Sequence, residues 1–114
     1  MDEPSPTLLV ALMRSIAILA MEAEEQTAYV RNLGTHPSLD ELALEFDDGF
    51  PLAPTFVEHG WLNHFAVLAL QELNHQLATM SEERKAGLWH ADALTTASEW
   101  ARVRALARAA ILAV

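Results

Sequence analysis

Alanine and leucine together fill one third of this chain, and this bias constrains the fold more than any other sequence feature. The 114 residues include 20 Ala and 18 Leu, and both residue types are strong helix formers. The β-branched residues that favour strands are sparse, and no stretch alternates apolar and polar side chains as a half-buried strand does. The composition therefore predicts an all-α protein.

Signals for helix starts and stops predict a compact bundle of three long helices with two short helices at the connections. Gly34 and Pro37 would end the first long helix. Capping boxes that begin at Ser38 and Thr96 would start the first short helix and the last long one, and Ser81 would cap the second short helix. The expected helices cover, in chain order, residues 7–33, 39–47, 55 or 56–80, 81–89 and 96–114. Gly60 weakens the first turns of the third, so a start at Trp61 stays open.

Apolar side chains at helical spacing predict one core in a single domain over residues 1–114. Ser15 lies within the first apolar stripe, where we expect its hydroxyl to donate to the backbone carbonyl four residues earlier. Arg14 beside it would need a carboxylate or carbonyl partner if it is buried. The expected core residues are Leu12, Ile16, Leu19, Leu39, Leu42, Phe46, Trp61, Phe65, Leu73, Trp100, Val103 and Ile111.

The N-terminal half of the first expected helix is apolar on nearly every side, and two interpretations stay open. In one, this helix is the central element of the fold and the other helices wrap it. In the other, one apolar strip pairs with a second copy of the chain, and we expect a homodimer on this basis. The strip for self-association would consist of Val10, Met13, Ala17, Ala20 and Met21.

Acidic residues outnumber basic ones, with 16 Asp and Glu against 7 Lys and Arg and a net charge of −9. Such a chain repels phosphate backbones, so nucleic acid is excluded as a partner. The acids concentrate in the first half, where they serve either solubility or attraction of a basic protein partner. The candidate partner surface comprises Asp40, Glu41, Glu45, Asp47 and Asp48.

Motifs for catalysis and cofactor binding fail on spacing or number. The chain has no cysteine, no glycine-rich phosphate loop and no Gly-x-Ser-x-Gly elbow. Glu72 and His75 have the Glu-x-x-His spacing of a di-iron half-site, but the second copy is missing. The alternative function is therefore a small-ligand or metal site of weak enzymatic potential that combines these two residues with Glu22 or Glu25. We expect no catalytic residue, no cofactor and no metal.

The apolar run over residues 8–21 resembles neither a signal peptide nor a membrane span. Asp2 and Glu3 precede it where a signal peptide carries positive charge, and Arg14 interrupts it. It is also shorter than the roughly 20 residues that a span needs. We therefore expect a cytoplasmic protein that does not enter the membrane.

Four segments, residues 37–48, 80–81, 88–89 and 98–104, resemble small all-helical proteins of actinobacteria. That resemblance implies a bacterial cytoplasmic protein and carries no activity, cofactor or catalytic residue. The failed motifs lead us to expect a non-enzymatic protein–protein interaction module of the regulator, adaptor or immunity type.

Overall fold

Every regular element is helical in the part of the chain that the computed structural model describes, which is residues 5–33, 39–82, 86–90 and 92–114. The all-α prediction is therefore confirmed over these residues. Gly34, Pro37 and Ser38, on which two helix boundaries were predicted, lie outside them. The helices are α1 (Pro6–Ala20), α2 (Ala23–Arg31), α3 (Asp40–Gly49), the 3₁₀ turn η1 (Phe50–Leu52), α4 (Ala53–Glu58), α5 (His64–Glu82), the 3₁₀ turn η2 (Ala86–Trp89), α6 (Ala93–Thr96) and α7 (Ser98–Ala113).

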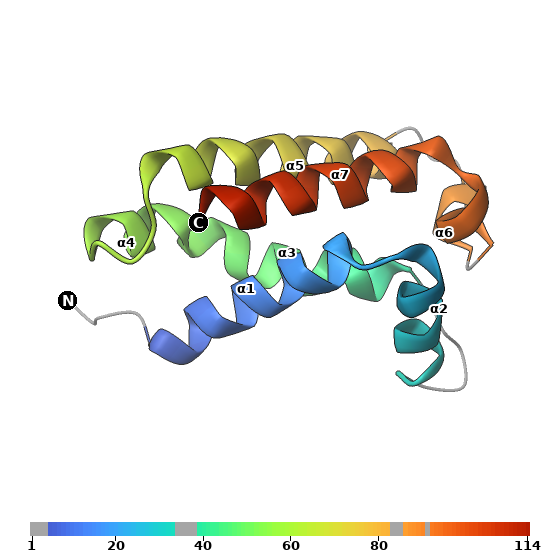
Figure 1. Cartoon of the computed structure of the whole chain (residues 1–114), viewed down its shortest axis with the longest axis horizontal. Coiled ribbons are helices and arrows are strands. Elements are labelled where there is room, and N and C mark those ends of the chain that lie inside the picture. The colour runs from blue at the N-terminus through green and yellow to red at the C-terminus, as the bar shows by residue number, and fades with distance from the viewer. Residues whose placement is uncertain (1–4, 34–38, 83–85, 91) are drawn as a thin grey trace.

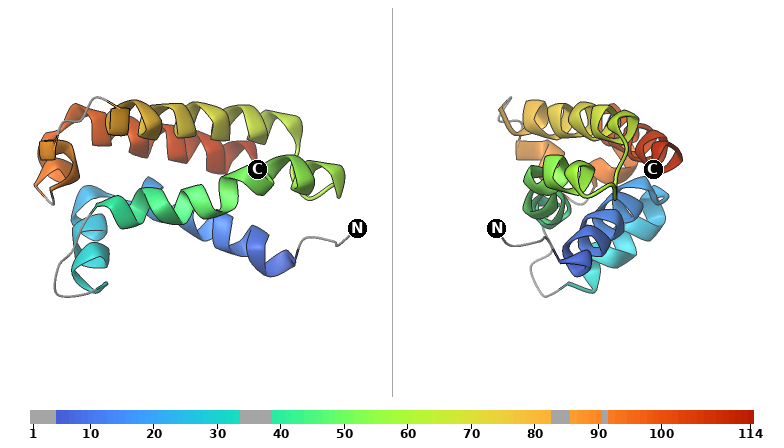
Figure 2. Two further views of the ribbon diagram at one scale, coloured as in Figure 1. Left: turned by 180° about the vertical axis from the view of Figure 1, so that it is seen from behind. Right: turned by 90° about the vertical axis from the view of Figure 1, so that its left-hand side faces the viewer.

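The helices form two layers in a body that measures 42 × 26 × 24 Å. In one layer, α5 and α7 run antiparallel and in close contact, and in the other α1 packs against α3 (Figures 1 and 2). The layers join because α7 also packs along α1, while α2 turns away from the end of α1 (Figure 1). No helix within the described ranges combines the length and the apolarity that crossing a bilayer requires.

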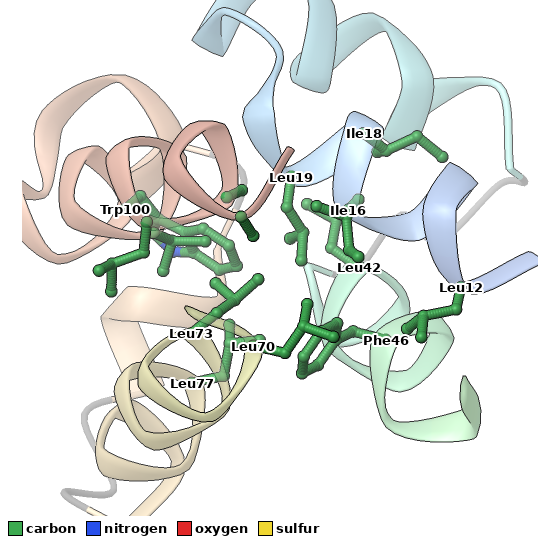
Figure 3. Close-up of a cluster of buried hydrophobic side chains, with 14 of the residues drawn as sticks. Leu12, Ile16, Ile18, Leu19, Leu42, Phe46, Leu70, Leu73, Leu77 and Trp100 are labelled. Atoms are coloured by element: carbon green, nitrogen blue, oxygen red, sulfur yellow. The ribbon is translucent and has the colours of Figure 1, made fainter. Parts of the chain in front are cut away.

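The buried side chains form one cluster between the layers, and Figure 3 shows α1, α3, α5 and α7 contributing to it. Trp100 is its largest member, and its indole Nε1 donates to the Leu88 carbonyl at 2.6 Å. The Trp89 ring meets the Trp100 ring edge-on at 5.6 Å. Nine of the predicted core residues are buried, namely Leu12, Ile16, Leu19, Leu39, Leu42, Phe46, Leu73, Trp100 and Val103.

Three predicted core residues are not fully buried. Two of them lie on helices whose buried side is rotated from the expected one. Phe65 is 75% exposed, because α5 buries the neighbouring Ala66 and consecutive residues of a helix point about 100° apart. Ile111 is 39% exposed beside the buried Ala110 for the same reason. Trp61 lies before α5 begins and is half-buried.

The long helix expected over residues 56–80 is broken between α4 and α5. Gly60 has φ +74°, a left-handed conformation that glycine adopts without strain. The Trp61 amide donates to the Phe56 carbonyl at 2.8 Å, which ends α4 as a Schellman motif. Asn63 then caps α5, because its Oδ1 accepts from the Ala66 amide at 2.8 Å. Gly60 and Asn63, which lie at the break, therefore account for it.

The long helix expected over residues 7–33 is also broken, because the backbone is extended at Met21 and Glu22 between α1 and α2. The buried Gln26 side chain occupies this break. Its amide Nε2 donates to the Ile18 carbonyl at 3.1 Å and to the Leu19 carbonyl at 2.9 Å. These bonds add partners to carbonyls at the end of α1, of which the Ile18 carbonyl also accepts from the Met21 amide at 3.2 Å.

Two arginines of α7 donate hydrogen bonds to residues at the α1–α2 break. Arg104 donates to the Gln26 side-chain oxygen at 3.2 Å and to the Leu94 carbonyl at 2.8 Å. Arg108 donates through Nε to the Ala20 carbonyl at 2.9 Å. Its other guanidinium nitrogen lies 2.9 Å from the Glu22 carboxylate. The break therefore depends on contacts with a helix far away in the sequence.

Two predicted capping roles of hydroxyl groups were wrong, and a third hydroxyl has the predicted role with a different acceptor. Thr96 does not cap α7, because its hydroxyl donates to the Asp92 carbonyl at 2.9 Å and Ala97 occupies the cap position. Ser81 lies within α5 and donates to the Leu77 carbonyl at 3.2 Å rather than starting a helix. Ser15 donates to the Leu12 carbonyl at 2.7 Å, three residues back rather than four. In each case the hydroxyl satisfies a nearby backbone carbonyl.

Candidate functional site

A hollow of about 570 Å³, which we call the acidic hollow, lies between α1, α2 and α3. One side is apolar, with Leu8 44%, Val10 65% and Leu33 44% exposed. Glu45 and Asp48 of α3 line the other side. Exposed aliphatic side chains and carboxylates therefore face the same space.

The acidic side is continuous along α3. Glu41, Glu45 and Asp48 are spaced i, i+4 and i+7, which places them along one side of the helix. Asp40 and Asp47, also spaced by seven, fall on another side. Glu45 is half-buried and the other four are exposed. Of the predicted partner surface, the structure thus brings Glu45 and Asp48 into the hollow, with Glu41 one turn away.

Tyr29 of α2 closes the hollow against α3. Its hydroxyl donates to the Glu45 Oε1 at 2.7 Å. Burial raises the pKa of the Tyr29 hydroxyl above its ordinary value of 10.0, and the hydrogen bond to Glu45 raises it further. Arg14 of α1 also lines the hollow and is exposed, so it does not need the buried partner considered for it.

The α1–α2 break creates this hollow. Leu8 and Leu33 are 25 residues apart, so an unbroken helix would separate them by about 37 Å. The turn at Met21 and Glu22 brings both to the same space. At the floor of the hollow, α3 approaches α1 so closely that a Cβ at Gly49 would lie 2.9 Å from the Leu12 Cβ.

The strip predicted for self-association is only partly accessible. Val10 and Ala17 are exposed, whereas Met13, Ala20 and Met21 are partly buried and pack against the core. The helix itself lies between α3 and α7. α1 is thus a core helix with a narrow exposed strip, and self-association through that strip stays a prediction.

A second hollow, of about 560 Å³, lies between α5 and α7. Glu72, His75 and Arg102 line it. Glu22 is not part of it, because Glu22 is paired with Arg108 near the end of α1, and Glu25 is exposed on α2. Among the described residues, no group of three or more metal-ligating side chains occurs. The structure therefore does not bring the alternative ligand set together.

Sequence reasoning selected Glu45 and Asp48 for a partner surface and Val10 for self-association instead, and it missed Tyr29 and Leu33. Both belong to the stretch expected to continue α1 away from this region. A usable signal was the identity of Tyr29 as the one tyrosine of the chain, since an aromatic ring with a polar tip is enriched at interfaces.

No protein-family model, curated protein or solved structure matches this chain. The function therefore has to be argued from the surfaces of the fold.

Proposed function

We propose that this protein is a non-enzymatic interaction module, of the regulator, adaptor or immunity type, that receives a basic protein partner in the acidic hollow. The observation that carries the proposal is that exposed apolar side chains and carboxylates line one space. Burial of the apolar side supplies affinity, and the carboxylates supply orientation and a fast approach.

The long-range charge supports the same partner. The net charge is −9, and residues 1–57, which build the acidic hollow, carry ten acids against two arginines. A field of one sign raises the local concentration of an oppositely charged partner and speeds association. A basic segment is therefore steered toward this end of the molecule.

The lining of the hollow, apolar on one side and acidic on the other, favours an amphipathic helix as the segment that binds. Such a helix presents apolar side chains at i, i+3 or i+4, and i+7, which would contact Leu8, Val10 and Leu33. Lysine or arginine on its flank would then face Glu45 and Asp48. The partner is thus a protein with an exposed helix that is apolar on one face and basic beside it.

Affinity capture with two matched variants tests this proposal. Asp48→Lys reverses a charge inside the hollow, whereas Asp47→Lys makes the same change on another side of α3. Wild type and both variants are immobilised, exposed to lysate of the source organism at low and high salt, and the retained proteins are identified by mass spectrometry. A synthetic peptide of the retained protein's basic helix is then titrated into the isotope-labelled chain and followed by NMR.

We expect a protein that the wild type and Asp47→Lys retain and that Asp48→Lys and high salt release. Its peptide should shift the amide signals of Val10, Leu33 and Asp48, with affinity about tenfold lower for Asp48→Lys. The proposal is wrong if retention does not depend on Asp48, or if the peptide shifts signals only elsewhere.

A further inference from the structure

The outer face of the α5–α7 layer carries exposed apolar side chains that the core does not use. Phe65 is 75% exposed, Leu68 46% and Leu112 87%. Between them on α7, the exposed Ala105 and Ala109 leave little side chain above the backbone. Large apolar side chains exposed together mark interaction surfaces. We call this surface, with Glu72 and Arg102, the outer face.

The register of the two helices separates this face into an apolar end and a charged end. The Asn63 side-chain amide donates to the Ala113 carbonyl at 2.8 Å, so the start of α5 lies level with the end of α7. Phe65 is therefore level with residues 109–112. Further along, Glu72 and Arg102 line the same hollow and lie at about one height.

We propose that the outer face binds a second copy of this chain, around a twofold axis parallel to α5 and α7. This axis places α5 of one copy on α7 of the other at the same height. Phe65 of one copy then covers Ala109 and Leu112 of the other, and Glu72 of one copy faces Arg102 of the other. Each contact occurs twice, as an interface of a twofold dimer requires.

The two surfaces of the molecule differ in charge in a way that selects this one for self-association. The acidic hollow carries two carboxylates against one guanidinium, that of Arg14, so an excess of like charge would meet itself in a twofold dimer and disfavour association. The outer face carries the two signs in balance, because Arg102 and Glu72 line the same hollow. It is therefore complementary to a copy of itself, and this inference is independent of the partner proposed for the acidic hollow.

The size of the outer face suits a dimer. The 16 residues of α7 extend over about 24 Å. Two helices about 10 Å apart then present about 500 Å² in projection. Side chains standing out from this plane bring the surface toward the roughly 800 Å² per partner of a stable interface. The small Ala105 and Ala109 allow the opposing helix to approach closely.

Sedimentation equilibrium of the full chain over a range of micromolar concentrations tests the apolar end. We expect a dimer for the wild type and a dissociation constant at least tenfold higher for Leu112→Glu. Since Leu112 is 87% exposed, this variant should keep its helicity by circular dichroism. Ala17→Glu, on the exposed strip of α1, should leave the dimer unchanged. A monomeric wild type, or a dimer that only Ala17→Glu weakens, overturns the proposal.

A charge exchange between two variants tests the proposed register. Glu72→Arg and Arg102→Glu each create like charges across the interface, so each variant alone should dimerise about tenfold more weakly. An equimolar mixture should recover a dimer with one copy of each, because every cross-interface pair is then attractive. Contacts within one copy are the same before and after mixing. A mixture no tighter than its components contradicts the proposed arrangement.

Discussion

The two helix breaks of this protein have different origins. The α4–α5 break is encoded where it occurs, since Gly60 supplies the left-handed conformation and Asn63 caps the next helix. The α1–α2 break combines a local contact with distant ones. Gln26 bonds to the nearby Ile18 and Leu19 carbonyls. Arg104 bonds to Gln26 across 78 residues, and Arg108 bonds to Ala20 across 88. A local break depends on residue type, whereas a distant one depends on the whole fold.

The α1–α2 break is the one that forms the candidate site. It turns α2 so that Tyr29 and Leu33 face the acidic hollow together with Leu8. The local break merely positions α5 for packing against α7. A change that loosens the α1–α2 break should therefore disturb both stability and partner binding, whereas a change at Gly60 should affect stability alone.

The largest effect is expected for Gln26→Leu. This variant leaves the Ile18 and Leu19 carbonyls and the Arg104 guanidinium without the buried amide, which should lower the free energy of unfolding by about 2–4 kcal/mol. Urea denaturation measures it. The matched control, Gln71→Leu on the exposed surface of α5, should change stability by less than about 0.5 kcal/mol. Equal effects of the two variants would mean that Gln26 does not hold the break.

A pair of arginine variants separates the two contacts from α7. Arg104→Met removes two hydrogen bonds of a half-buried guanidinium and should cost about 1–2 kcal/mol. Arg108→Met removes an exposed hydrogen bond to the Ala20 carbonyl and an ion pair whose side chains are 48% and 68% exposed, and should cost about 0.5 kcal/mol. Denaturation curves recorded side by side give the order, and a larger loss for Arg108→Met would show that the break is fixed at the surface.

A smaller loss of stability is expected for a change at the α4–α5 break. Gly60→Ala places a Cβ in a left-handed conformation and should cost about 1 kcal/mol, although no atom lies within 4 Å of that Cβ. Gly87→Ala also meets no atom within 4 Å and has no positive φ, so it should be close to neutral. The difference between their thermal midpoints isolates the conformational effect. Identical midpoints would remove the local explanation.

The smallest effect concerns the titration of Tyr29. Because the folded-state pKa is raised above 10.0, the protonated hydroxyl stabilises the fold below about pH 10, and this contribution is lost as the pH rises through the folded-state pKa. Glu45→Gln should lower that pKa toward 10.0 without reaching it, since burial, the larger cause, remains. The chain has one tyrosine, so tyrosinate absorbance reports this group directly. An unchanged titration would show that Glu45 does not contribute.

Sequence information recovered those parts of the fold that depend on local pattern. The stripe of Leu39, Leu42 and Phe46 correctly placed the buried face of α3, and Trp100 with Val103 placed that of α7. It failed where distant groups decide the outcome. Gln26 bonds to nearby carbonyls, but the arginines that complete the turn of α2 belong to α7, so no local pattern predicts that turn.

The candidate site divides in the same way. Glu45 and Asp48 could be selected from the clustering of acids on one short helix. Their assembly with Leu8 and Leu33 could not, since it requires the α1–α2 break. The sequence thus indicated the sign of the surface, and the fold supplied its apolar side.

NMR of two synthetic peptides in a helix-promoting solvent tests most directly whether the two breaks differ in origin. One peptide covers residues 5–33 and the other residues 53–82, and backbone chemical shifts report helix at each position. Residues 5–33 should form one continuous helix through Met21 and Glu22, because without Arg104 and Arg108 of α7 the bonds of Gln26 alone do not hold the break. Residues 53–82 should remain broken at Gly60. A break that persists at Met21 in the first peptide, or a continuous helix in the second, would contradict the account.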